Sequence, residues 1–184
     1  MPRLILLLVL MLCSTTSFAQ IFTVQIGENS ARFHYTSNPV GQVLGPLELN
    51  GGLLFNDDDD YSINFGAHVR GENLDAPLLV AIGVRGYYTR AVSSDAFSIA
   101  IGADVNWMPV RVPGLEVGGY LYGAPEILSF SDGERLLDYG VRVGYQIIPL
   151  ATIYLGYQNF DVDIESKGRA TLDDGFMVGV HFRF

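Results

Sequence analysis

The sequence has little of what a soluble or disulfide-bonded protein relies on. Its 184 residues include one lysine, Lys167, and one cysteine, Cys13. A soluble surface normally exposes many lysines, so their scarcity argues against such a surface. Because Cys13 lies in the leader described below, the rest of the chain has no thiol for a disulfide or for thiol chemistry.

Long apolar runs and helical periodicity are also missing. Beyond the leader, no stretch of 18 consecutive apolar residues occurs, so the sequence predicts no transmembrane helix. No long segment follows the 3.6-residue period of an amphipathic helix, which favours an all-β fold. The sequence has no metal-ligand spacing, phosphate-binding loop or nucleophile motif, so we expect neither a metal nor a cofactor.

The first 19 residues have the composition of a secretory signal peptide. Arg3 supplies a positive charge, residues 4–12 form an apolar core, and residues 17–19 give a small-x-small cleavage site. Cys13 is not expected to carry a lipid, because Leu12 precedes it where lipoprotein processing needs a small residue. We therefore expect residues 1–19 to be removed and residues 20–184 to form a single domain.

The remaining chain is acidic. Without Arg3 it carries 10 basic and 20 acidic side chains. This balance argues against binding to nucleic acid and against direct attraction to anionic lipid.

The last ten residues alternate strictly between two faces. Phe176, Val178, Val180, Phe182 and Phe184 share one parity, and Met177, Gly179, His181 and Arg183 share the other. A soluble protein gains little by ending on an exposed phenylalanine. A bacterial outer-membrane barrel closes with such a strand, its apolar face in lipid. For this segment alone, an amphipathic edge strand is the alternative.

Most of the chain before it repeats this pattern. We expect ten strands, over about residues 21–26, 31–36, 45–55, 61–70, 78–88, 97–107, 115–122, 137–147, 153–160 and 175–184. The ninth becomes ambiguous in parity near Gln158 to Phe160, where a β-bulge could lie. Most of these strands are longer than those of soluble sheets and suit a tilted strand that crosses a bilayer.

The connections favour an up-and-down barrel. The turns near Gly71, Pro109 and Pro149 are mostly short, whereas polar loops are expected over residues 56–60, 93–95, 124–135 and 165–174. Short periplasmic turns alternating with longer external loops are typical of outer-membrane barrels, and two periplasmic termini require an even strand count. The sequence therefore predicts a ten-stranded antiparallel transmembrane β-barrel, or an eight-stranded one if the hairpin 21–36 lies outside the wall.

The outward parity has no charge in the middle of any strand, as lipid requires. Its tyrosines and Trp107 lie near strand ends, like an aromatic girdle. A secreted soluble barrel or sandwich that binds an apolar ligand is the alternative, and it would place the same apolar parity inside.

The opposite parity carries charges of both signs, which we expect inside the barrel: Arg32, Glu48, Arg70, Arg85, Asp104, Glu116, Asp138, Arg142 and Arg183. Because an unpaired buried charge is costly, the simplest interpretation is a lumen filled by Arg–carboxylate pairs. A narrow channel for small polar solutes, or a ligand pocket, is the alternative. The inner face is close to neutral, so most of the excess negative charge lies in loops.

Two acidic groups are candidates for weak contact with cations or lipopolysaccharide. One is Asp57, Asp58, Asp59 and Asp60, and the other is Asp161, Asp163 and Glu165. The simpler interpretation of both is a solvated loop. His34, His68 and His181 fall on the inward parity, which does not suit a hydrolase acting on lipid, so we expect no enzyme.

Several segments resemble the YfaZ family of bacterial outer-membrane proteins. They are residues 29–33, the aspartates 57–60 before Tyr61, residues 113–125, residues 154–157, and the ending from 171–175 through Phe182, Arg183 and Phe184. The resemblance implies an outer-membrane barrel of unassigned activity, structural or porin-like, with no active site to carry over. The chain also resembles other outer-membrane barrels in ending with a strand whose last residue is aromatic. That resemblance implies that the barrel assembly machinery recognises Phe182 and Phe184. The partners we expect are that machinery, outer-membrane lipid and lipopolysaccharide, with the barrel itself a monomer.

Overall fold

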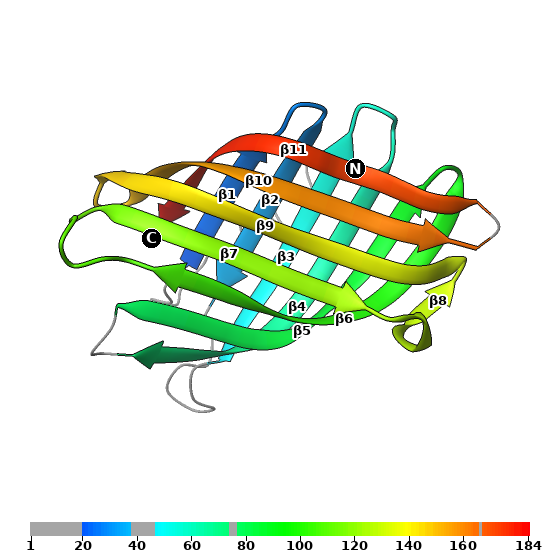
Figure 1. Ribbon diagram of the computed structural model, residues 1–184, viewed down its shortest axis with the longest axis horizontal. Coiled ribbons are helices and arrows are strands. Elements are labelled where there is room, and N and C mark those ends of the chain that lie inside the picture. The colour runs from blue at the N-terminus through cyan, green and yellow to red at the C-terminus, as the bar shows by residue number, and fades with distance from the viewer. Residues whose placement is uncertain (1–19, 38–46, 74–76, 166) are drawn as a thin grey trace, which may run out of the picture.

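The computed structural model describes residues 20–37, 47–73, 77–165 and 167–184, which form an antiparallel sheet that closes on itself (Figure 1). Its strands are β1 (Gln20–Ile26), β2 (Ser30–Ser37), β3 (Leu47–Asn56), β4 (Tyr61–Asn73), β5 (Leu78–Ala91), β6 (Ser94–Trp107), β7 (Leu115–Ala124), β8 (Ser129–Ser131), β9 (Gly133–Ile148), β10 (Ala151–Ile164) and β11 (Gly168–Arg183). Among these residues no helix is long and apolar enough to span a membrane. The predicted signal peptide, residues 1–19, lies outside them.

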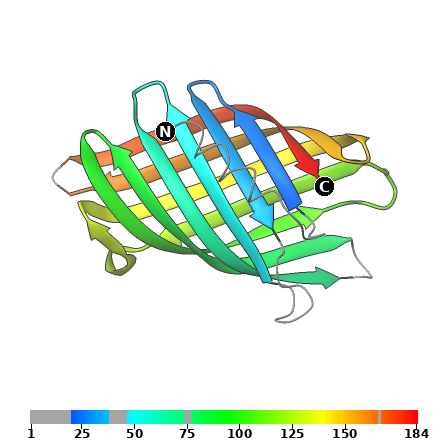
Figure 2. The ribbon, with the colours of Figure 1, turned by 180° about the vertical axis from the view of Figure 1, so that it is seen from behind.

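Ten of these strands form the barrel wall. β1 pairs with β11, from Ile21 opposite Arg183 to Ile26 opposite Val178, which closes the ring. The short β8 pairs with β6 beyond the point where β7 stops, so β8 continues the wall position of β7 after a break at the 3₁₀-helix η1 (Glu126–Leu128). Figure 2 shows the far side, where β1 to β5 lie across the lumen from β7, β9, β10 and β11. The prediction of ten wall strands is confirmed, including the hairpin 21–36.

Exposure along the strands identifies the outward parity. Phe65 and Phe176 are 71% and 82% exposed, whereas Tyr87 and Gln158 on the other parity are 0% exposed. A soluble barrel would hide its aromatics and show its polar residues, so the alternative with the apolar parity inside is wrong. An apolar outside and a polar inside suit a barrel surrounded by lipid.

Glycines let the inner wall accept large neighbours. A Cβ built on Gly83 would lie 2.1 Å from the carbonyl oxygen of Ala67, and one on Gly179 would lie 2.3 Å from the ring of Tyr154. No real Cβ approaches other atoms so closely. The missing side chain lets the β4 backbone approach Gly83, and at Gly179 it makes room for the Tyr154 ring.

The two ends of the barrel differ. We call the end with the turns 27–29, 57–60, 92–93 and 125–132 the loop end, and the end at which β1 begins and β11 ends the terminus end. Polar loops over 93–95 and 165–174 were predicted, and these bounds are wrong, because β6 begins at Ser94 and β11 at Gly168. Outward-facing polar side chains form cross-strand hydrogen bonds in these extensions. Tyr88 donates to Asp95 (2.9 Å), and Thr171 donates to Asp161 (2.6 Å).

A β-bulge lies in β11. Phe160 pairs with Asp173 but the next residue, Asp161, pairs with Thr171, so Leu172 is the extra residue. Leu172 and Asp173 are both buried, at 2% and 7% exposed. The bulge predicted near Gln158 to Phe160 is therefore present at this height, but on the partner strand.

Candidate functional site

All nine charged residues predicted for the lumen form ion pairs with one another. The pairs are Arg32–Asp138 (3.0 Å), Arg70–Glu48 (2.6 Å), Arg85–Asp104 (3.1 Å), Arg183–Glu116 (2.6 Å) and Arg142–Glu116 (3.9 Å). Some cross the lumen: Arg32 on β2 reaches Asp138 on β9, on the other side of the β1–β11 seam. The lumen thus contains the Arg–carboxylate pairs that the inward parity predicts.

The central layer of the lumen is sealed. We give this name to Arg32, Tyr87, Tyr120, Asp138 and Asp173. Arg32 Nη1 donates to Asp138 Oδ1 (3.0 Å) and to the Tyr120 hydroxyl (2.8 Å), while the Tyr87 hydroxyl donates to Asp138 Oδ2 (2.8 Å). The Asp138 side chain is 1% exposed and that of Arg32 is 8% exposed, so water does not reach this ion pair.

An apolar plug fills the lumen between the central layer and the loop end. Its members are Leu54, Ala91, Ala96, Ala100, Ala124, Leu136, Phe160, Val162, Ile164 and Leu172, all 2% exposed or less. Small alanines on β5, β6 and β7 accompany larger side chains on β9, β10 and β11. The Phe160 ring contacts the central layer, with its centroid 5.6 Å from that of Tyr87. Bonds between hairpins also hold this end together, among them Glu165 N to Asp132 O (2.8 Å) and Lys167 Nζ to Val92 O (2.5 Å).

A polar chamber of about 370 Å³ occupies the terminus-end half of the lumen. His34, His68 and His181 all line it, although they are far apart in sequence. Four of its charged side chains reach solvent, because those of Asp104, Arg183, Arg70 and Arg142 are 34%, 33%, 31% and 26% exposed. The chamber is therefore wet, in contrast to the central layer.

Two hydrogen-bonded groups organise the chamber. Glu116 accepts from Asn106 Nδ2 (2.8 Å) and Arg183 Nη2 (2.6 Å), and His181 Nε2 lies 3.3 Å from it. Across the chamber, Arg85 Nη2 donates to both carboxylate oxygens of Asp104 (3.1 Å each), and Tyr122 donates to the same carboxylate. His68 lies beside this second group, 3.1 Å from the Tyr122 hydroxyl and 2.8 Å from Asn50 Nδ2.

Sequence reasoning missed two members of these networks. Asp173 lies 3.7 Å from Arg32 and accepts from Ser30 (2.8 Å), although it was placed in a loop. The bulge at Leu172 reverses the parity at this point, and no pattern marks it. The second is Tyr122, whose contact with Asp104 and His68 depends on the stagger of neighbouring strands, which the sequence does not state.

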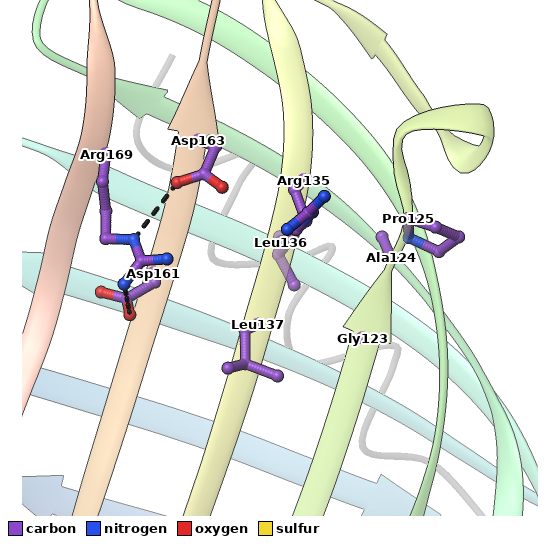
Figure 3. Close-up of a pocket in the computed structure, with 9 residues that line it drawn as sticks. All are labelled: Gly123, Ala124, Pro125, Arg135, Leu136, Leu137, Asp161, Asp163 and Arg169. Carbon is purple, nitrogen blue, oxygen red and sulfur yellow. Dashed lines mark hydrogen bonds and ion pairs between the residues drawn. The ribbon is translucent and has the colours of Figure 1, made fainter.

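A second hollow, of about 510 Å³, lies on the outer face near the loop end, and its lining residues are drawn in Figure 3. Arg169 reaches from β11 toward two aspartates of β10, with Nε 3.3 Å from Asp163 and Nη1 3.8 Å from Asp161. Arg135 and Leu137 of β9 line the same hollow. The two aspartates considered for cation contact are thus engaged by an arginine.

The four aspartates 57–60 lie in the β3–β4 turn at the loop end. The turn is held by Asn56, whose Oδ1 accepts from the backbone N–H of Asp58 (3.1 Å) and of Asp60 (2.9 Å). Asp60 in turn accepts from the backbone N–H of Val92 (3.1 Å). Over the described ranges, no group of three or more His, Cys, Asp or Glu residues is arranged to hold a metal ion.

Comparison with known proteins places the chain in a family and among barrels. A family model described as YfaZ precursor matches residues 3–184. A search of curated proteins found no match. A solved bacterial polysaccharide outer membrane secretin superposes with a TM-score of 0.56 at 11% identity, over 93% of this chain and 67% of that chain. The KdgM porin in complex with disordered oligogalacturonate gives 0.48 at 10% identity (90% and 99% covered), and the NanC porin 0.46 at 10% (91% and 100%). At these identities the likeness shows the fold alone.

Proposed function

The chain belongs to the YfaZ family, and from that premise we propose that it is a porin-like outer-membrane barrel that is closed to solutes in its resting state. The observation that carries the proposal is the pair of barriers between the polar chamber and the loop end. A solute that enters the chamber meets first the central layer, in which Asp138 is 1% exposed, and then the apolar plug. The narrow-channel alternative would need an open path through both.

The proposed location follows from the surface and from the termini. Phe65, Phe176 and the other outward aromatics suit lipid, and β1 and β11 pair at the terminus end, where the Gln20 N–H donates to the carbonyl of Phe184 (2.9 Å). The composition of residues 1–19 is that of a secretory signal peptide with a small-x-small site, which supports cleavage after Ala19. We therefore propose export, removal of residues 1–19, and insertion with the terminus end toward the periplasm. The proposed role is structural or porin-like and not enzymatic.

This proposal has a direct test. Membrane fractions of expressing cells should contain the protein in the outer membrane, and an unboiled sample should migrate differently from a boiled one, because closed barrels resist detergent until heated. In planar bilayers the folded protein should give no steady conductance at neutral pH. Recovery in the soluble periplasm would contradict the location, and steady single-channel openings would contradict closure.

The terminal aromatic strand supplies a separate prediction. Phe182 and Phe184 are outward, at 42% and 62% exposed, and the Phe184 backbone is paired with Gln20, so the last side chain adds little internal packing. We propose that it acts as an assembly signal. Deleting Phe184 should lower the amount of folded barrel in the membrane several-fold, whereas the purified variant should refold in detergent as the parent does. Equal membrane levels of the two chains would remove that role.

A further inference from the structure

The outer hollow near the loop end contains an arginine that pairs with no carboxylate. Arg135 of β9 lines this hollow and is exposed. In Figure 3, dashed lines join Arg169 to Asp161 and Asp163, and none reaches Arg135. Thr171 also donates to Asp161, at 2.6 Å. Both carboxylates are therefore engaged by other groups, and within the described ranges the Arg135 guanidinium makes no ion pair.

The strand register places Arg135 and Arg169 in one row. Arg135 pairs across the sheet with Asp163, which pairs in turn with Arg169, so the row crosses β9, β10 and β11. A guanidinium presents N–H donors that match phosphate oxygens, and its hydrogen bonds to an anion are about twice as strong as neutral ones. The row is thus suited to an anionic group that binds at Arg135, while Arg169 offsets the charge of the aspartates.

An apolar groove of about 970 Å³ lies on the outer wall, on the terminus side of this hollow and on the same strands. Its lining includes Val117 of β7, Val141 and Val143 of β9, and Val178 of β11. Phe176 of β11 also lines it and is 82% exposed, so the ring stands out from the wall beside the shorter valines. In a barrel surrounded by lipid, such a groove suits an acyl chain.

Tyr157 marks the boundary between the hollow and the groove. Its ring lines the groove, and its hydroxyl donates to Asp174, which lies toward the loop end. A tyrosine with its ring in hydrocarbon and its hydroxyl in a polar setting is typical of the membrane–water interface. The hollow therefore lies at the height of lipid headgroups and the groove at the height of acyl chains.

The separation of the two features fits a single lipid. Leu137 in the hollow and Val141 in the groove are four residues apart on β9. At about 3.3 Å per residue this is roughly 13 Å, and the tilt of membrane strands reduces it to about 10 Å along the membrane normal. The headgroup region of one leaflet is of the same order, roughly 5–8 Å thick. One lipid can therefore reach both features.

We propose that the outer hollow and the groove together bind one phosphorylated lipid of the outer leaflet. The Arg135 guanidinium donates to a phosphate oxygen, and an acyl chain lies in the groove against Val141 and Phe176. The proposal rests on the proposed function for its orientation, because a terminus end toward the periplasm puts the loop end in the outer leaflet. After the leader the chain carries 20 acidic against 10 basic side chains, so long-range attraction does not favour anionic lipid elsewhere, and one lipid per barrel is expected.

The headgroup and the acyl chain are tested separately with lipid A, the same lipid A with its phosphates removed, and inorganic phosphate. Native mass spectrometry of the folded barrel, released from dodecyl maltoside micelles, counts the lipids that each barrel keeps. Lipid A should bind once per barrel, and roughly tenfold to a hundredfold more tightly than the dephosphorylated lipid, the range of one charge-assisted hydrogen bond. Millimolar inorganic phosphate should not displace it.

Each contrary result overturns a stated part of the proposal. Equal binding of lipid A with and without its phosphates would overturn the role of Arg135. Displacement by inorganic phosphate would mean that the hollow takes a soluble anion and not a lipid. A broad distribution of lipid counts, or no retained lipid, would overturn the single site.

A variant series locates the lipid. Arg135→Gln should weaken lipid A binding by the same roughly tenfold to a hundredfold and leave the dephosphorylated lipid unaffected. Arg135→Lys, which keeps the charge, should lose less. Val141→Trp should fill the groove and weaken the binding of both lipids. Arg90→Gln is the matched control, because Arg90 is an exposed arginine near the loop end of β5, outside the hollow and the groove.

The heat-dependent band shift checks the folding of each variant before its lipids are counted. A folded Arg135→Gln barrel with the affinity of the parent, or an equal weakening by Arg90→Gln, would overturn the site. Binding is measured in micelles. A barrel that is recovered from the periplasm or that conducts would therefore refute the proposed function and leave this result standing.

Discussion

Replacing Asp138 with alanine should lower the free energy of unfolding of the barrel by about 3–5 kcal/mol, the cost of leaving one member of a buried ion pair alone. Asp138 is the hub of the central layer, because it accepts from Arg32 at 3.0 Å and from Tyr87 at 2.8 Å. Without it, Arg32 keeps a buried positive charge whose next carboxylate, Asp173, is 3.7 Å away. The Tyr87 hydroxyl also loses its acceptor.

The comparison that isolates burial is Glu48→Ala. This change also leaves an arginine without its carboxylate, because Glu48 pairs with Arg70 at 2.6 Å. The Arg70 side chain, however, is 31% exposed and can be solvated by water. Its loss should cost about 1 kcal/mol or less, as for exposed ion pairs. Asp138→Asn keeps an acceptor oxygen for Tyr87 and should fall between the two.

Urea titration of the barrel in detergent micelles, with the folded fraction taken from the unboiled gel band, measures the free energy of unfolding of all three variants and of the parent. Equal losses for Asp138→Ala and Glu48→Ala would contradict the sealed central layer, because they would mean that Arg32 has the same access to water as Arg70. A loss for Asp138→Ala below 1 kcal/mol would have the same meaning.

The barrel and its inward charges could be predicted from the sequence because lipid imposes a simple rule. The outer face of the barrel must be apolar, so each spanning strand alternates between apolar and polar residues. The face on which Arg85 or Asp138 lies therefore follows from its sequence neighbours alone. That is a local property. The nine lumen charges were assigned to the correct face on this basis, without knowledge of any contact.

The pairing partners of the lumen charges could not be predicted from local parity. Arg32 and Asp138 are 106 residues apart, and their contact depends on the tilt and stagger of strands around the closed ring. The parity of the paired strand indicated a bulge at this height, but nothing in the sequence of β11 places it at Leu172, where it decides that Asp173 joins Arg32. The strand extensions beyond Asp95 and Asp174 were missed because the outward face is polar there, as at Asp95 and Thr171, so the alternation that marks a membrane strand is absent.

The apolar plug was missed for the opposite reason. The inward parity is apolar near the loop end, as in Leu54 beside Leu53 and Leu136 beside Leu137, and a two-face rule assigns apolar residues to lipid. Consecutive leucines on opposite faces are the signal that could have revealed a filled lumen. The distinction matters for function, since the plug and the central layer are arranged in series.

Two barriers in series make a prediction about conductance. Substituting serine at Arg32 and Asp138 together removes the central ion pair, and the remaining Asp173 keeps its hydrogen bonds from Ser30 and Gln158. Substituting serine at Phe160 and Leu172 opens the plug. Each double variant should remain closed in planar bilayers, because the other barrier still blocks the lumen. The quadruple variant should conduct steadily, since each barrier then has a gap lined by two serines on the path from the chamber to the loop end.

The serine substitutions are chosen so that the quadruple variant keeps its fold. Truncating a buried Phe or Leu costs about 2–5 kcal/mol when a dry cavity remains, but a hydroxyl-lined path that fills with water lacks most of that cavity cost. Folding is checked by the heat-dependent band shift before each recording. Conductance in the Phe160→Ser, Leu172→Ser double variant alone would show that the central layer is no barrier. A folded quadruple variant that stays silent would place the block elsewhere, and the two-barrier account of closure would then be wrong.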